Sequence, residues 1–259
     1  MTEWNAEAYH RVSGPQTEWG RRVLARLELR GDERVIDAGC GTGRLTAELV
    51  GRLHHGHLIA IDRSWNMLLT ARANLRPEFG RRVSYVRVEL PHMPFHETAD
   101  LVFSTATFHW VRDHDALFRN IYGSLRPGGR LFAQCGGGPN LAAAHALADE
   151  VMRLPIFAPH FADWRGVWEF AEPDRTARRL RAAGFVDVRT GLEPAPTRLA
   201  DDASYREFVT TVIYHAHLAH IPAPDLRARF IDEVTARSAR QDPPFTLDYW
   251  RLNMEATRR

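Results

Sequence analysis

The segment VIDAGCGTGRL, residues 35–45, limits the fold more than any other part of the chain. A short apolar run ends in Asp37, and glycines follow at Gly39, Gly41 and Gly43. Glycine adopts positive φ without a steric penalty and lets the backbone come close to a ligand. The segment therefore predicts a buried strand, a tight turn and the start of a helix, with a small molecule lying against the turn.

Strand-like and helix-like segments alternate along most of the chain. Apolar runs predict strands at residues 34–38, 57–62, 83–88, 99–105, 129–135, 185–191 and 245–256. Helical spacing predicts helices at residues 16–29, 44–53, 64–75, 113–125, 141–153, 174–183 and 201–240, the last broken at 221–224. We therefore expect an α/β fold. It would contain a Rossmann-like parallel sheet of about seven strands with the last strand antiparallel, helices on both faces and a mostly helical cap.

The alternation loosens after Gly136 and marks a change in organisation. Residues 1–138 are expected to form an N-terminal segment and the cofactor-binding core. Residues 139–172 and 197–243 are expected to pack together as a helical substrate cap over one end of the sheet. Residues 173–196 and 244–259 are expected to complete the core sheet.

Composition excludes several classes of partner. The formal net charge of +2 is too small to attract nucleic acid or an anionic membrane, and no apolar run is long enough to span one. The two cysteines, Cys40 and Cys135, form no CxxC pair, and the N-terminus lacks the apolar core of a signal peptide. We therefore expect a cytoplasmic protein, monomeric or homodimeric, that acts on a small molecule.

The glycine spacing discriminates between nucleotide ligands. A dinucleotide fingerprint reads G-x-G-x-x-G/A, whereas Arg44 follows Gly43 here, and the Gly-Lys-Ser/Thr ending of a P-loop is absent. The carboxylate of Asp37 would repel a pyrophosphate and suit a cationic ligand. A nicotinamide-dependent oxidoreductase therefore stays as an alternative that this spacing disfavours.

At this point the chain resembles a known family. VIDAGCGTG resembles the first motif of the class I S-adenosylmethionine-dependent methyltransferases. IAID, VRVELPHMPF, ADLVFSTATFHWV and LRPGGRLF follow in the order and spacing of that family's later motifs. The opening WNAEAYHRVSGPQ is similar to that of the trans-aconitate methyltransferase group, in which such a segment folds over the cofactor.

The resemblance implies S-adenosyl-L-methionine as the cofactor and assigns roles to individual residues. Asp62 would bind the ribose hydroxyls, and Glu89 with Leu90 would border the adenine. The glycine turn would approach the amino-acid end of the cofactor, while the N-terminal segment closes the site. The full predicted set is Tyr9, Arg11, Asp37, Gly39, Cys40, Gly41, Gly43, Asp62, Arg63, Met67, Glu89, Leu90, Thr105, Ala106 and Trp110.

Each assignment has a simpler structural alternative. Asp37 is also suited to a helix cap, and Asp62 competes with Ser64 for the cap of the next helix. Cys40 fits a small buried filler better than a nucleophile, because no base lies nearby in the sequence. Trp110 is equally compatible with the core and with the site.

The donor sulfonium is already activated, so catalysis by proximity and desolvation is expected. A base is needed only if the acceptor arrives protonated, which a carboxylate does not. His109, just after the fourth strand, is the candidate for an accessory base. No metal site is predicted, because His215, His217 and His220 have no cysteine or acid nearby to complete a ligand set. A protein that binds S-adenosylmethionine without catalysis is the remaining alternative.

Overall fold

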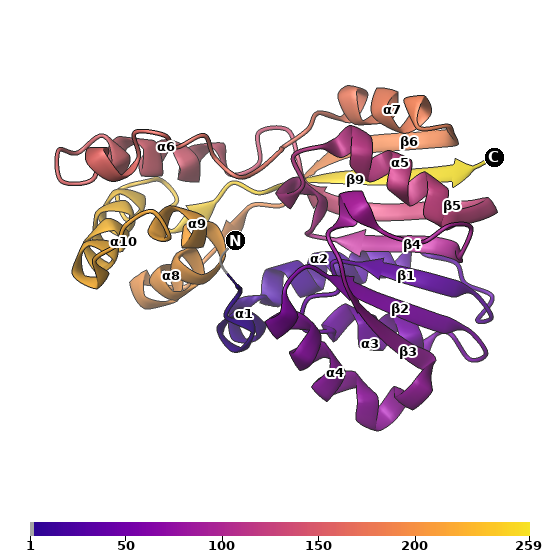
Figure 1. Cartoon of the computed structure of the whole chain (residues 1–259). Helices are drawn as coiled ribbons and strands as arrows, with labels where there is room; N and C mark the ends of the chain where they lie inside the picture. The colour runs from indigo at the N-terminus through magenta and orange to yellow at the C-terminus, as the bar shows by residue number, and fades with distance from the viewer. Residues whose placement is uncertain (1–2) are drawn as a thin grey trace.

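The computed structural model describes residues 3–259 and is built on a seven-stranded sheet in the order β3-β2-β1-β4-β5-β9-β6 (Figure 1). Neighbours from β3 to β5 are parallel, and β9 runs antiparallel to both β5 and β6. The strands are β1 (Arg34–Ala38), β2 (His57–Asp62), β3 (Val83–Arg87), β4 (Ala99–Thr105), β5 (Leu125–Gly136), β6 (Phe185–Pro194) and β9 (Trp250–Arg258). The predicted Rossmann-like sheet with its last strand antiparallel is confirmed.

The helices follow the predicted positions, with one addition at the N-terminus. They are α1 (Ala6–Val12), α2 (Gly14–Ala25), α3 (Arg44–Gly51), α4 (Trp65–Phe79), α5 (His114–Ser124), α6 (Ala142–Met152), α7 (Pro173–Ala182), α8 (Asp202–Phe208), α9 (His215–Leu218) and α10 (Pro224–Ser238). Short 3-10 turns are η1 (Gly80–Arg82), η2 (Leu90–His92), η3 (Phe108–Trp110) and η4 (Ala158–His160). Helix α1 was not predicted from the sequence; in it, Asn5 caps the first turn by accepting from the Ala8 N–H.

Both faces of the sheet are covered, because buried strand residues alternate between two cores. Val35 of β1 packs with residues of α2, α3 and α4, whereas its neighbour Ile36 packs with residues of α5 and α7. The same alternation holds in β2, where Leu58 joins the first core and Ile59 the second. This is the period of two that a strand with both faces buried must show.

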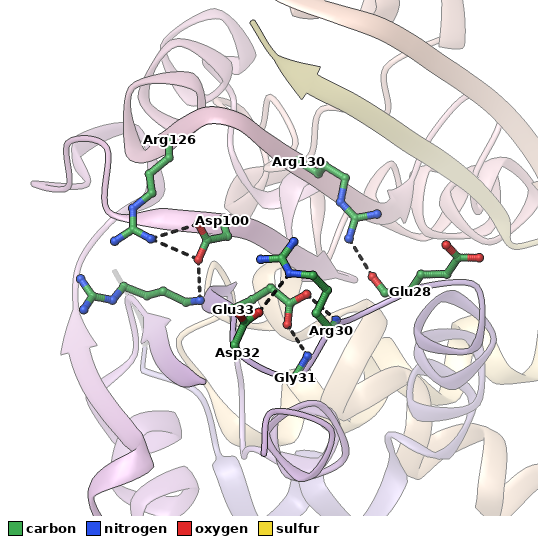
Figure 2. Close-up of polar contacts among 9 residues, drawn as sticks. Glu28, Arg30, Gly31, Asp32, Glu33, Asp100, Arg126 and Arg130 are labelled. Carbon is green, nitrogen blue, oxygen red and sulfur yellow. Dashed lines mark hydrogen bonds and ion pairs between the residues drawn. The ribbon is translucent and has the colours of Figure 1, made fainter. Parts of the chain in front are cut away.

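Polar contacts fix the amino ends of the strands (Figure 2). The buried Glu33 carboxylate accepts from the Arg30 and Gly31 N–H groups at 2.6 and 2.9 Å and so forms the turn before β1. Asp100 of β4 accepts from the Arg34 N–H at 2.8 Å and from Arg126 at 3.0 Å (Figure 2). Structural contacts therefore occupy the amino edge of the sheet.

The cap elements form a separate hydrophobic core beside the carboxyl edge, where α6, α8, α9 and α10 lie to the left of the sheet in Figure 1. The segment predicted as a helix over 201–240 is interrupted by a π-helical turn, η5 (Val209–Ile213), as well as before Pro224. The segment predicted as one strand over 245–256 is also divided. Its first part, β8 (Thr246–Leu247), pairs with β7 (Thr197–Arg198) in a second sheet.

Asp248 explains this division of the last strand. Its carboxylate accepts from the Ala143 and Ala144 N–H groups at the start of α6, and its carbonyl accepts from the Leu141 N–H. The chain between β8 and β9 therefore holds the cap helix α6 against the sheet, and only β9 joins the main sheet.

Candidate active site

A cavity of about 350 Å³ lies at the carboxyl ends of the parallel strands, where open α/β sheets bind ligands. Its wall is formed by the turn after β1, the ends of β2 and β4, the segment after β3, the N-terminal segment and the cap. The predicted residues that line it are Tyr9, Gly39, Gly41, Asp62, Arg63, Met67, Glu89, Leu90, Thr105, Ala106, His109 and Trp110. The fold thus brings together most of the predicted site.

The other predicted residues lie outside the wall of this cavity. Arg11 is exposed and forms an ion pair with Glu207 of the cap at 3.2 Å. Gly43 caps α3 with a φ of 84°, and Cys40 is buried in the core beneath the turn. Asp37 is buried below the turn, where Thr46 donates to its Oδ2 at 2.6 Å.

Burial sets the protonation of Asp37. It raises the pKa of this carboxyl to about 7, more than the Thr46 hydrogen bond lowers it, and the nearby Asp62 charge adds to the increase. Thr46 lies in the first turn of α3, so Asp37 joins β1 to that helix. A cation at the turn would favour the charged form of this carboxyl.

Asp62 ends β2 and holds the glycine turn. Its Oδ2 accepts from the Gly41 N–H at 3.0 Å and its Oδ1 from the Ser64 N–H at 2.9 Å. Ser64 is the residue that caps α4, through its hydroxyl and the Met67 N–H. Burial raises the pKa of Asp62, while these hydrogen bonds oppose the increase. A carboxylate has about four lone-pair sites, so it can also accept a further donor from the cavity.

The N-terminal segment joins the core to the cap. Glu3 accepts from the Ser64 hydroxyl at 2.7 Å, and the Asn66 side chain donates to the Trp4 carbonyl. The Trp4 ring lies 5.4 Å from the Trp110 ring and 4.1 Å from the ring of His215 in the cap. The segment therefore covers the cavity, and Trp4 is one of its lining residues.

The polar wall residues that were not predicted from the sequence include Asn140, Tyr249 and Arg251. Tyr249 and Arg251 lie at the start of β9, which runs antiparallel, so its amino end meets the carboxyl ends of the other strands. That topology was the available signal, because it places the DYWR stretch at the ligand edge. The Arg251 side chain is 3% exposed and lies 4.6 Å above the Trp19 ring.

The cap contributes aromatic side chains to the cavity. Trp168 and Phe170 line it, with their rings nearly parallel and 6.1 Å apart. His217 packs behind them against Trp164 and Trp168, and burial lowers its pKa to about 3. It is therefore neutral and serves packing. Within residues 3–259, no group of three or more His, Cys, Asp or Glu side chains is placed so that it could hold a metal ion.

Known proteins agree with this geometry. Residues 35–129 match the family model described as a methyltransferase domain. The trans-aconitate 2-methyltransferase of Delftia acidovorans is 32% identical over 73% of this chain and 72% of that protein. The enzyme of the same name from Afipia carboxidovorans is 30% identical over 94% of this chain and 93% of that protein.

Within residues 3–259, no helix is both long and apolar enough to cross a membrane.

Two solved structures share the fold. Phosphoethanolamine N-methyltransferase 2 of Haemonchus contortus, in complex with S-adenosyl-L-methionine, has a TM-score of 0.63 at 17% identity and covers 98% of this chain and 56% of that one. The YcgJ protein of Bacillus subtilis has a TM-score of 0.63 at 16% identity, over 93% and 97%. These structures show the shared fold, and the methyltransferase domain match together with the sequence relatives confirms S-adenosylmethionine as the cofactor against the nicotinamide alternative. The chain belongs to the class I S-adenosylmethionine-dependent methyltransferases and is an enzyme of that family.

Proposed function

We propose that this enzyme transfers the methyl group of S-adenosylmethionine to a carboxylate of a small molecule and forms a methyl ester. The observation that carries the proposal is the guanidinium of Arg251, a buried cation in the cavity wall. Within residues 3–259 no carboxylate forms an ion pair with it, and its Nε has no hydrogen-bond partner.

The cofactor fits the half of the cavity formed by the glycine turn and the strand ends. The Asp62 carboxylate lies at this wall and has acceptor capacity left for a ribose hydroxyl. At Gly41 a side chain would enter open space, so the cavity can accept a ligand against the backbone there. Glu89 and Leu90 are proposed to border the adenine, and Thr105 with Ala106 to line the cofactor through their backbone.

Arg251 is proposed to bind the acceptor. Taking a cation out of water is unfavourable unless an anion or several hydrogen-bond acceptors compensate it. Burial lowers the pKa of Arg251, and the charge of Glu193 acts in the opposite direction without forming an ion pair. Because arginine stays protonated at neutral pH, a bound carboxylate would supply a directly paired counter-charge and two acceptor oxygens.

A carboxylate acceptor also needs no catalytic base. When bound, the cofactor supplies a methyl group on a sulfonium, which leaves as a neutral thioether. A carboxylate oxygen carries no proton, so no residue of this chain would have to remove one as the O–C bond formed and the S–C bond broke. The protein then has to orient the two reactants and exclude water, which the N-terminal segment and the cap are placed to do.

The cap is proposed to select the acceptor. The curated relatives are named for trans-aconitate, which makes that acid the first compound to test. The wall formed by Trp110, Trp168 and Phe170 also offers apolar contact to a flat acceptor body. The proposed division therefore assigns cofactor binding to the core and acceptor choice to residues 139–172 and 197–243.

The test is a methylation assay with labelled cofactor on trans-aconitate, on aromatic and aliphatic monocarboxylates, and on their alcohol and amine counterparts. We expect a product that mild alkali hydrolyses, as an ester requires. Arg251→Met should lower kcat/KM by about 10-fold to 100-fold and leave cofactor affinity unchanged, since a charged hydrogen bond contributes about 1.5–3 kcal/mol. Arg81→Met, at an exposed position, is the control. Products formed only on the alcohols or amines would contradict the proposal.

A further inference from the structure

His109 occupies the place where the β4–β5 ladder ends. Thr105, the last residue of β4, lies opposite Gln134, and the Ala106 N–H donates to the Gln134 carbonyl. Strand β5 continues to Gly136, whose N–H donates to Nδ1 of His109 at 3.2 Å. Nδ1 of the imidazole thus accepts the N–H that the carbonyl of a further β4 residue would otherwise accept.

This hydrogen bond fixes the tautomer of His109. A backbone N–H is always a donor, so Nδ1 must accept and cannot carry a proton. Burial, together with the charge of Arg251, holds the pKa of His109 well below its usual range, so the ring is neutral. The single ring proton lies on Nε2. His109 therefore has no free lone pair with which to act as a base, but it has one N–H to donate.

Asn140 is oriented in the same way. Its Oδ1 accepts from the Trp250 N–H at 2.9 Å, which leaves its amide NH₂ as a donor at the cavity wall. A Cβ added to Gly136 would lie 2.8 Å from the Asn140 Nδ2, so this amide packs directly on Gly136. Arg251 lies opposite Gly136 in the β5–β9 register. Gly136 is therefore the common neighbour of three donors.

We propose that His109 binds the acceptor carboxylate by donating its Nε2–H, and that Asn140 and Arg251 donate to the same carboxylate. This inference rests on the proposed function, since it assumes that the acceptor is a carboxylate. It gives His109 a role opposite to the accessory base expected from its position in the sequence. Three donors around one glycine orient a carboxylate, whereas an alcohol or amine would leave donors unpaired in a buried wall.

Two amide substitutions separate the two nitrogens of His109. In His109→Asn the side-chain oxygen takes the place of Nδ1 and can still accept from the Gly136 N–H, but no donor reaches the position of Nε2. In His109→Gln the side-chain amide reaches the position of Nε2 and can donate there. The Asn variant therefore keeps the structural hydrogen bond and loses the proposed acceptor contact.

Kinetics on a carboxylate acceptor test the proposal. His109→Asn should lower kcat/KM by about 10-fold to 100-fold, chiefly through KM, with cofactor affinity unchanged. His109→Gln should recover much of that loss. The wild-type profile of kcat against pH should show no ionisation between pH 6 and 9 that either variant removes. Equal constants for wild type and His109→Asn, or an ionisation that disappears in both variants, would overturn the role of His109.

Nitrogen-15 NMR of the histidine rings gives a readout independent of turnover. With the His109 signals assigned by their absence from His109→Asn, we expect a protonated Nε2 and an unprotonated Nδ1 from pH 6 to 8. A proton on Nδ1, or a charged ring at pH 7, would overturn the inference even with an active enzyme. If no carboxylate is esterified by the wild type, the proposed function fails and this inference with it. If the wild type esterifies a carboxylate but the kinetics of the variants or the NMR result is the contrary one, only the inference is overturned.

Discussion

The Gly41 N–H donates to Asp62 Oδ2 across 3.0 Å and so joins the turn after β1 to the end of β2. The Gly39 and Cys40 N–H groups strengthen the same link by donating to the Ile61 carbonyl. The carboxylate and the glycine backbone, which are proposed to bind different parts of the cofactor, therefore keep a fixed relative position. Replacing either residue should therefore weaken cofactor binding.

Replacing Asp62 should weaken cofactor binding. In Asp62→Ala the ribose hydroxyls would lose their acceptor, and the Gly41 and Ser64 N–H groups would lose their partner. We expect the Kd for S-adenosylmethionine to rise about 10-fold to 100-fold, measured by calorimetry. Asp163→Ala, an exposed acid in the cap, is the control and should bind as the wild type does. Unchanged affinity of Asp62→Ala would remove this carboxylate from the site.

The glycines of the turn should respond differently to alanine. Both Gly39 and Gly41 have positive φ, 84° and 54°, so each alanine adds about 1–2 kcal/mol of backbone strain. At Gly39 the new Cβ would also lie 2.2 Å from the Thr107 hydroxyl, whereas at Gly41 it meets nothing within 4 Å. Gly39→Ala should therefore lower the free energy of unfolding more than Gly41→Ala does.

Gly41→Ala should instead show its main effect in cofactor binding, because its methyl group would occupy space at the cavity wall. Urea unfolding of both variants, with and without cofactor, separates the two effects. A Gly41→Ala protein that bound S-adenosylmethionine as tightly as the wild type would show that the cofactor does not approach this part of the backbone.

The sequence predicts which core residues line the cavity because its signals there are local. The glycine turn and Asp62 follow strands whose apolar runs are short and continuous, and the order of the segments places their ends at one edge. The boundaries of β1, β2 and β4 accordingly agree with the predicted ranges. Asp37, which the sequence pattern assigns to the site, lies buried beneath the cavity wall, a depth that the pattern alone does not indicate.

The part of the cavity proposed to bind the acceptor depends on contacts between residues far apart in the chain. The His109 tautomer is set by Gly136, 27 residues later, and Arg251 reaches the wall only because β9 is antiparallel. The π-helical turn that brings Val212 and Ile213 to the cavity also has no distinct local pattern. Periodicity describes single elements, so it could not have shown which side chains of the cap face the site.

The N-terminal segment should control how long the cofactor stays bound. Trp4→Ala would remove the ring contacts to Trp110 and His215, each worth about 0.5–1.5 kcal/mol. We expect about 10-fold faster dissociation of S-adenosylmethionine, measured by stopped-flow fluorescence or by displacement. Trp65→Ala is the matched control, because this nearby ring is 50% exposed. Equal dissociation rates in the two variants would argue against closure by Trp4.

Asp37 should make the stability of the enzyme fall as the pH rises toward neutrality. Its pKa is about 7 in the folded protein against 3.8 ordinarily, so between these values the folded state binds more protons than the unfolded state. The contribution of Asp37 to the free energy of unfolding is complete below about pH 4. It decreases as the pH rises through 7, and the total decrease is at most about 4 kcal/mol. Asp37→Asn removes this titration and keeps an acceptor for Thr46.

The difference in the free energy of unfolding between wild type and Asp37→Asn reports on Asp37 alone, because the histidines titrate in both proteins. Urea unfolding of the cofactor-free proteins should therefore show the Asp37→Asn variant gaining stability relative to the wild type from pH 5 to pH 8. The two should be most alike at the acidic end of the series. If the free energies of unfolding of the two proteins ran parallel against pH across this range, Asp37 would be charged in the folded protein. A cationic ligand would then not be needed to ionise it.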